Sequence, residues 1–258
     1  MRKIYIRLLF FILILFSIDT LGQTIKSLKP TLGYLVDKSP EGETQFLNDQ
    51  KECSDLWKKQ GTGTQLTIDE KKRLEENCME DGPEGYYEIL GVGCSWYCGG
   101  GQDTQTASSE LKPSKDIHYS ASNAHDLNYK SAWVEGVSGY GIGESLTYHF
   151  PPETPRITKV IVVNGYVKSK KAWTENSRVK TLRMYLNDKP FAILNLEDTR
   201  QEQEFKFDPI GNGDRSDWNK LKTASSWSMK FEIVDVYKGD KYDDTVITEI
   251  YFDGIDVH

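Results

Sequence analysis

The stretch WSMKFEIVDVY, residues 227–237, alternates apolar and polar side chains with a period of two. The apolar positions are Trp227, Met229, Phe231 and Ile233, and the polar positions between them are Ser228, Lys230 and Glu232. Successive side chains of a β-strand point to opposite faces of the sheet, so this pattern predicts a strand with one buried face.

Strand patterns of the same kind recur along the second half of the chain. They cover residues 144–150, 156–164, 178–187, 190–196, 204–208 and 246–255. Turn-forming residues separate these segments, and no long helical pattern lies among them. The sequence therefore predicts an all-β sandwich that presents its functional residues on loops.

The first residues have the pattern of a secretory signal peptide. Arg2, Lys3 and Arg7 precede an apolar run, which is too short for a membrane-spanning helix and is followed by a short polar stretch. We expect cleavage after residue 22 and a mature start at Gln23, which places the protein outside the cell, in a periplasm or on a cell surface.

The charge of the chain disfavours polyanionic partners. Without residues 1–22 the chain loses three basic residues and one acidic residue, so its formal charge moves from −7 to −9. Such a chain has no bulk attraction for nucleic acid or for anionic lipid. We therefore expect no nucleic-acid binding and no strong membrane binding.

Residues 23–84 differ in character from the remainder, residues 85–258. Pro30, Pro40 and Gly42 interrupt residues 23–50, which indicates a linker or a loosely packed lead-in. Helix-forming residues follow from Lys51 to Asp81, with Thr67 and Glu70 spaced as a capping box. We expect a small segment of short helices here, clipped by a disulfide.

Four cysteines, Cys53, Cys78, Cys94 and Cys98, follow the signal peptide, and export favours disulfides. Four thiols allow three pairings. Cys53 with Cys78 and Cys94 with Cys98 are favoured because each pair brackets a local unit, although spacing alone does not decide the pairing. A zinc site is disfavoured because there is no C-x-x-C pair. We also expect Trp96, which lies between two cysteines, to pack on a disulfide.

The stretch HDLNYKSAWVEGVSGYGIGE, residues 125–144, is rich in glycine and polar side chains. Its glycines precede a strand and lack the phosphate-loop spacing, and GVSGY does not match a nucleophile elbow. Asp126, Asn128 and Ser131 instead supply three side-chain oxygens within six residues, which suits calcium. The alternative is a network of Asx turns that shapes the loop without a metal.

Several blocks in the same order resemble the discoidin-like, galactose-binding-like β-sandwich family, and within it the NADase-type glycan-binding domain. The blocks are residues 120–122, residues 126–143 with Trp133 and Glu135, residues 164–180 and residues 236–250. The resemblance covers roughly residues 85–258 and implies a jelly-roll carbohydrate-binding module. It also implies Glu249 as a fourth calcium ligand. NAD hydrolysis belongs to a separate catalytic domain in such toxins, and residues 23–84 are too few for one, so we expect no enzymatic activity.

Sugars present apolar faces together with many hydroxyl groups, so their sites combine aromatic rings with amide, carboxylate or guanidinium groups. Two loops hold such mixtures, and the candidate ligand-binding residues are Tyr166, Trp173, Glu175, Asn176, Arg178, Tyr237 and Tyr242. The alternative for Trp173 is a core cap beneath its loop. The leading hypothesis is a secreted, non-catalytic, lectin-like protein that binds a glycan or glycoconjugate. The second hypothesis is a protein-interaction or adhesion module on the same fold.

Overall fold

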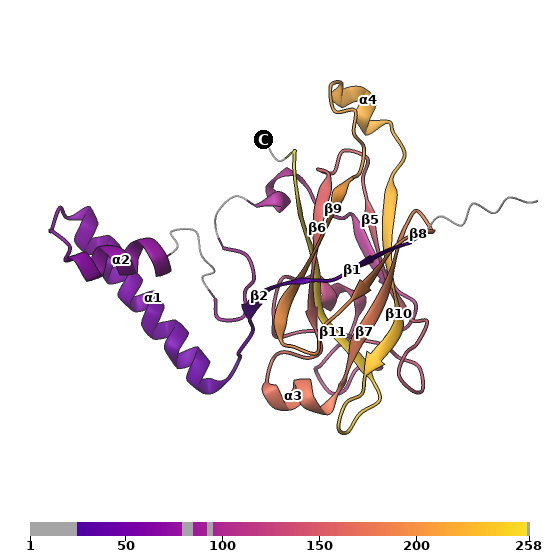
Figure 1. Cartoon of the computed structure of the whole chain (residues 1–258), viewed down its shortest axis with the longest axis horizontal. Coiled ribbons are helices and arrows are strands. Elements are labelled where there is room, and N and C mark those ends of the chain that lie inside the picture. Colours follow the sequence, from indigo (N-terminus) through magenta and orange to yellow (C-terminus); the bar gives the residue numbers. More distant parts are fainter. Residues whose placement is uncertain (1–24, 79–84, 92–94, 257–258) are drawn as a thin grey trace, which may run out of the picture.

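The computed structural model describes residues 25–78, 85–91 and 95–256 (Figure 1). The helices are α1 (Pro40–Gly61), α2 (Ile68–Asn77), η1 (Trp96–Gly99), η2 (Ala121–Ala124), α3 (Lys170–Glu175) and α4 (Trp218–Lys222). The strands are β1 (Lys26–Leu28), β2 (Thr31–Leu35), β3 (Thr104–Ala107), β4 (Trp133–Val134), β5 (Ser145–Phe150), β6 (Ile157–Asn164), β7 (Ser177–Leu186), β8 (Lys189–Asn195), β9 (Gln201–Ile210), β10 (Trp227–Tyr237) and β11 (Thr245–Gly254).

The described strands form one continuous hydrogen-bonded sheet, which folds over on itself as a sandwich. Its order is β2-β9-β6-β11-β7-β10-β5-β3, with β8 beside β7, β1 beside β8 and β4 beside β11. Strands β11 and β7 pair in parallel at only two positions, Thr245 with Ser177 and Val246 with Arg178. Side chains from both halves of the sheet meet in one buried cluster, for example Phe205 and Phe252 against Leu182 and Phe231. The predicted all-β sandwich is confirmed.

Strand β10 has the predicted bounds and the predicted faces. Trp227, Met229, Phe231 and Ile233 are all buried, whereas Ser228, Lys230 and Glu232 are partly exposed. The turn between β7 and β8 is made by Asn187 and Asp188, which both have positive φ angles of 48° and 61°. Two positive φ angles at the centre of a hairpin match the right-handed twist of its strands.

The lead-in predicted for residues 23–50 is wrong for most of its length. Strand β1 pairs in parallel with β8, and β2 pairs antiparallel with β9, so this segment covers edges of two strands of the sandwich. Each strand is too short to show a periodic pattern, and its stability comes from the edge that it pairs with. Covering such edges protects a sandwich from pairing with other chains.

The helical segment is longer than the sequence predicts, because α1 begins at Pro40 rather than after residue 50. Ser39 is the N-cap, and its hydroxyl accepts a hydrogen bond from the Gly42 N–H. Pro40 and Gly42 thus lie in the first turn of a helix, where proline is well tolerated, and do not interrupt one. The predicted capping box of Thr67 and Glu70 is confirmed at the start of α2.

Helices α1 and α2 form a hairpin that stands beside the sandwich in Figure 1; we call it the arm (residues 40–77). The predicted disulfide between Cys53 and Cys78 is present and ties the end of α2 to the middle of α1. Leu56, Leu66 and Leu74 pack with Cys78 in the small core of the arm. Cys94 lies outside the described residues, and so does the predicted pairing of Cys94 with Cys98.

Candidate functional site

The four predicted metal-binding residues lie together where the loop after η2 meets β11. The Asn128 N–H donates to both Asp126 Oδ1, at 3.1 Å, and Glu249 Oε1, at 2.9 Å. The Ser131 hydroxyl donates to Asp126 Oδ2. Leu127 has a positive φ angle of 58°, which turns the loop between Asp126 and Asn128. The structure thus brings residues 126–131 of the loop to a glutamate more than 100 positions away.

Glu249 is fully buried, and its Oε2 atom has no hydrogen-bond partner among the described residues. Burial raises the pKa of Glu249 well above its usual range, and the neighbouring Asp126 raises it further. A buried carboxyl group is normally hydrogen-bonded, paired with a charge or bound to a cation. An orphaned oxygen beside a second carboxylate is therefore an arrangement that a cation would satisfy.

The donor set suits calcium chemically, because it offers two carboxylates, an amide oxygen and a hydroxyl. Within the described part of the chain, no three His, Cys, Asp or Glu side chains gather as a metal site. The Asx turns of the alternative reading are also present, since Asn128 Oδ1 accepts from the Lys130 N–H at 2.9 Å. The two readings are compatible because each carbonyl or carboxylate oxygen has two lone pairs.

His125 precedes this cluster, and its burial predicts a pH dependence of stability. Its Nδ1–H donates to the Ile250 carbonyl at 2.6 Å, and its Nε2 is buried without a partner among the described residues. Burial lowers the pKa of His125 to about 4. The stability that this group contributes is complete above the unfolded pKa of about 6.5 and is lost as the pH falls toward 4. We expect a loss of at most about 3 kcal/mol in the free energy of unfolding.

The measurement is denaturant unfolding at pH 7, 6, 5 and 4. His125→Asn can keep the hydrogen bond to Ile250, and we expect it to flatten the acid limb of the stability curve. His149→Asn, at an exposed position of β5, is the control and should leave that limb unchanged. Equal acid sensitivity of wild type and His125→Asn would show that another group is responsible.

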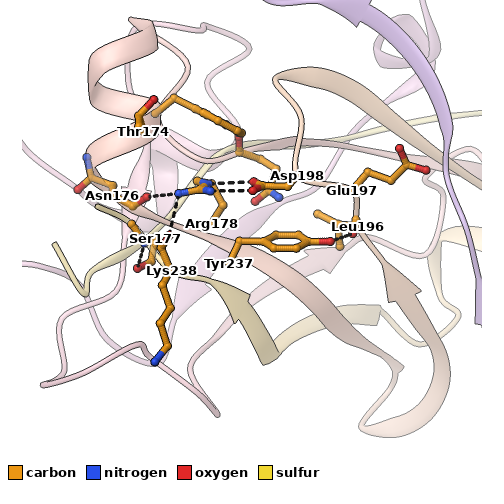
Figure 2. Close-up of polar contacts among 12 residues, drawn as sticks. Thr174, Asn176, Ser177, Arg178, Leu196, Glu197, Asp198, Tyr237 and Lys238 are labelled. Atoms are coloured by element: carbon orange, nitrogen blue, oxygen red, sulfur yellow. Dashed lines mark hydrogen bonds and ion pairs between the residues drawn. The ribbon is translucent and has the colours of Figure 1, made fainter. Parts of the chain in front are cut away.

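Arg178, at the start of β7, is the centre of the polar cluster in Figure 2. Its guanidinium donates to both carboxylate oxygens of Asp198, at 3.0 and 2.8 Å. It also donates to the backbone carbonyls of Asn176, at 3.0 Å, and Lys238, at 3.2 Å. Its guanidinium carbon lies over the Trp173 ring, 4.5 Å from the ring centre. Arg178 therefore joins three loops at this end of the sandwich.

Most of the candidate ligand-binding side chains near Arg178 use their polar groups inside the protein. The Trp173 indole N–H donates to the Asn164 carbonyl at 2.9 Å, so the core-cap alternative describes its position well. The Asn176 amide donates to the Ala172 carbonyl, and the Tyr237 hydroxyl donates to the Leu196 carbonyl. Tyr166 is buried beside Lys168. These residues shape the loops and leave little of themselves for a ligand.

A more exposed group of side chains lies beside them and includes the two remaining candidates, Glu175 and Tyr242. Tyr242 is 41% exposed, with the Lys241 ammonium 4.6 Å from its ring centre. The Tyr242 N–H donates to the Glu175 carbonyl, which fixes this loop to the end of α3. Lys238 lies 4.8 Å from the ring centre of Tyr140 on the glycine-rich loop. We call this group the α3-end surface; its residues are Tyr140, Glu175, Lys238, Lys241 and Tyr242.

Sequence reasoning missed three residues that build this end of the molecule. Asp198 lies in a turn between β8 and β9, and no local pattern indicates its pairing with Arg178. Asn164 is buried and bridges β6 to Val179, where it both donates to the carbonyl and accepts from the N–H. Gly165 has a φ angle of 77°, and a Cβ there would lie 2.5 Å from Arg178 Cγ. The Asn-Gly pair was the one available signal, since it favours a turn with positive φ.

Comparisons with solved structures give neighbours of low identity. They include the CBM32-1 and CBM32-2 domains of ZmpB from Clostridium perfringens, at 12% identity and a TM-score of 0.41 over 60% of this chain and 35% of that one. A CBM32-3 domain from a family 31 glycoside hydrolase of the same organism has 14% identity and a TM-score of 0.40, over 58% of this chain and 91% of that one. The arabinofuranosyltransferase AftD from Mycobacteria has 16% identity and a TM-score of 0.40, over 60% and 10% of the two chains.

This chain spans about a third of the length of the first solved structures that it matches. No curated protein matches it. A family model described as the NAD glycohydrolase translocation F5/8 type C domain matches residues 96–253, which is more than half of the chain. That match runs from η1 into β11. It includes the α3-end surface and the four predicted metal-binding residues, Asp126, Asn128, Ser131 and Glu249. The protein therefore belongs to the family of NAD glycohydrolase translocation F5/8 type C domains, which are discoidin-like.

Proposed function

We propose that this protein is a non-catalytic carbohydrate-binding module and that it binds a glycan on its α3-end surface. The observation that supports this most is the exposed ring of Tyr242, which has the Lys241 ammonium beside it and a backbone bond to Glu175. An aromatic ring can stack on the apolar face of a sugar, and the neighbouring ammonium and carboxylate can bond its hydroxyl groups. The cluster of Arg178 holds these loops in place, so the surface is formed before a ligand arrives.

A glycan array followed by titration tests the role of Tyr242. We expect Tyr242→Ala to weaken binding of the best array glycan at least about tenfold, because the stacking ring is lost while the loop backbone is kept. Tyr34→Ala is the matched control, since Tyr34 is an exposed tyrosine on β2 in a different part of the sandwich. Equal affinity of Tyr242→Ala and Tyr34→Ala would exclude the α3-end surface as the site.

We further propose that Asp126, Asn128, Ser131 and Glu249 hold a structural calcium ion. Calcium would give the buried Glu249 carboxylate a positively charged partner, and would fix loop residues 126–131 against β11. Because the ion binds only the folded chain, calcium at 100 times its dissociation constant should stabilise the protein by about 2.7 kcal/mol.

The measurement is thermal unfolding with calcium and with a chelator. Glu249→Gln can still accept the Asn128 N–H through its amide oxygen, and we expect it to abolish the rise in melting temperature. Asp243→Asn, on an exposed loop, should keep the full rise. A wild-type melting temperature that is the same with calcium and with chelator would contradict the proposal.

An adhesion or protein-interaction role is the second candidate function. It is favoured by Val137 and Ile142, which are 40% and 57% exposed on the glycine-rich loop beside Tyr140. Exposed apolar side chains at loop tips suit a protein partner more than a sugar. Val137→Ser with Ile142→Ser should leave glycan affinity unchanged if the leading proposal holds.

Export supports either role, and we propose that residues 1–22 are removed as a signal peptide. The disulfide between Cys53 and Cys78 fits an oxidising compartment. Among the described residues, no helix is long and apolar enough to cross a membrane. N-terminal sequencing of the secreted protein should begin at Gln23, and a sequence beginning at Met1 would exclude cleavage.

A further inference from the structure

A pocket of ≈ 310 Å³ lies away from the α3-end surface, between η1 and the outward-facing side chains of β6, β9 and β11. Trp96 and Tyr97 of η1 and Tyr251 of β11 give it aromatic walls, and Ile161 of β6 adds an apolar one. Its volume is at the lower end of the ~300–1,000 Å³ that is common for small-molecule sites. The pocket is large enough for one small ring.

The charged side chains that line this pocket are held in ion pairs. The Lys159 ammonium lies 2.9 Å from Asp253 Oδ2 and 3.6 Å from Glu204 Oε1. The ammonium of Lys206 lies 3.5 Å from the other oxygen of Glu204. Lys206 lies outside the lining. Both carboxylates of the lining are thus paired with an ammonium, and each of their oxygens can still accept a hydrogen bond. The pocket therefore suits a neutral ligand that carries hydroxyl groups better than an ion.

Trp96 lines the pocket with a side chain that is itself almost fully buried. Its side chain is only 2% exposed, and its indole N–H has no partner among the described residues. Buried donors without partners are rare because they have lost water and gained nothing in exchange. The indole nitrogen has almost no accessible surface, so Trp96 serves this pocket as a wall and as a reporter and not as a donor. The neighbouring Tyr97 hydroxyl already accepts from the Phe252 N–H at 2.9 Å, which fixes η1 against β11.

We propose that this pocket is a second saccharide site, which takes one neutral sugar ring. The aromatic walls contact the apolar face of the ring, and Asp253 and Glu204 accept from its hydroxyl groups. Thr245 is at the end of β11 near α3, and Asp253 is eight residues further along the strand. Eight residues of a strand span about 26 Å. The two sites are thus separate, and this one stands whether or not the α3-end surface binds a glycan.

The test follows the indole N–H signals of the full chain by ¹H–¹⁵N NMR during titration with neutral methyl hexosides and N-acetylhexosaminides. The chain has six tryptophans, and Trp96→Phe assigns one indole signal by its disappearance. We expect one of these glycosides to shift the Trp96 signal in a saturable way. The probes are monosaccharides, so this result does not depend on the array glycan.

Two variants separate this site from the α3-end surface. Asp253 Oδ1 accepts a hydrogen bond from the Gly254 N–H at 2.8 Å, and Asp253→Asn keeps an oxygen for it. We expect this variant to lower the affinity for the glycoside at least about tenfold. Tyr242→Ala should leave that affinity unchanged. A Trp96 signal that no neutral glycoside shifts would overturn the proposal, as would one that only a charged sugar acid or amino sugar shifts. An unchanged affinity in Asp253→Asn would also overturn it.

Discussion

Replacing Arg178 with alanine is expected to lower the free energy of unfolding by about 2–4 kcal/mol, because it removes a buried guanidinium that donates to two backbone carbonyls and to Asp198, which is 37% exposed. The Arg178 side chain is only 8% exposed. The change leaves the carbonyls of Asn176 and Lys238 without their donor, and it takes away the group that stacks on Trp173. Since these loops form the α3-end surface, glycan affinity should fall with stability.

Denaturant unfolding measures this loss, and Lys180→Ala is the matched control. Lys180 is also a cation on β7, and its ammonium lies 2.7 Å from Asp235. Both side chains of that pair are about half exposed, so water replaces the interaction and stability should hardly change. Arg178→Lys should be intermediate, because lysine keeps the charge and lacks the planar fork that bonds both oxygens of Asp198. A loss in Arg178→Ala no larger than that in Lys180→Ala would show that Arg178 does not brace the loops.

Replacing Cys53 with serine is expected to unfold the arm while the sandwich stays folded. The disulfide closes a sequence separation of 25 residues, for which the chain-entropy model gives about 3.5 kcal/mol. The core of the arm has few buried side chains, chiefly Leu56, Leu66 and Leu74, so it cannot offset a loss of that size. The backbone amides of α1 and α2 should therefore lose most of their protection from hydrogen exchange.

Hydrogen exchange with mass spectrometry separates the two parts of the chain. In Cys53→Ser, and in wild type with reductant, peptides from α1 and α2 should exchange rapidly while peptides from β10 keep their protection. Ser54→Ala, at an exposed position on the same helix, should exchange as wild type does. Slow exchange of the arm without its disulfide would mean that the helices are held by contacts other than the bond.

The sequence predicts those parts of the fold that have a long local period. Strand β10 is an example, because residues 227–233 alternate between buried and partly exposed side chains. The capping box at Thr67 is another local signal that the structure confirms. Strands β1 and β2 could not be predicted in this way, since they are short and are defined by the edges of β8 and β9.

The candidate sites, too, could be predicted only where their residues are close together in the sequence. The Asp126, Asn128 and Ser131 pattern is local, and only the family resemblance added Glu249, whose bond to Asn128 spans 121 positions. The mixture of residues 166–178 predicts a glycan-binding loop, whereas the structure turns most of its polar groups inward, around Arg178. Which aromatic ring stays exposed depends on how three loops pack. Tyr242 is one of the candidates that the sequence predicts, and only that packing distinguishes it from the buried ones.

The most direct test of a glycan site on the α3-end surface is ¹H–¹⁵N NMR mapping of the full chain with the best array glycan at saturation. Backbone signals of Tyr140, Glu175 and residues 238–242 should shift together and should return when the glycan is removed. A saturated complex in which these signals do not move would contradict the central claim, whatever else on the molecule responds.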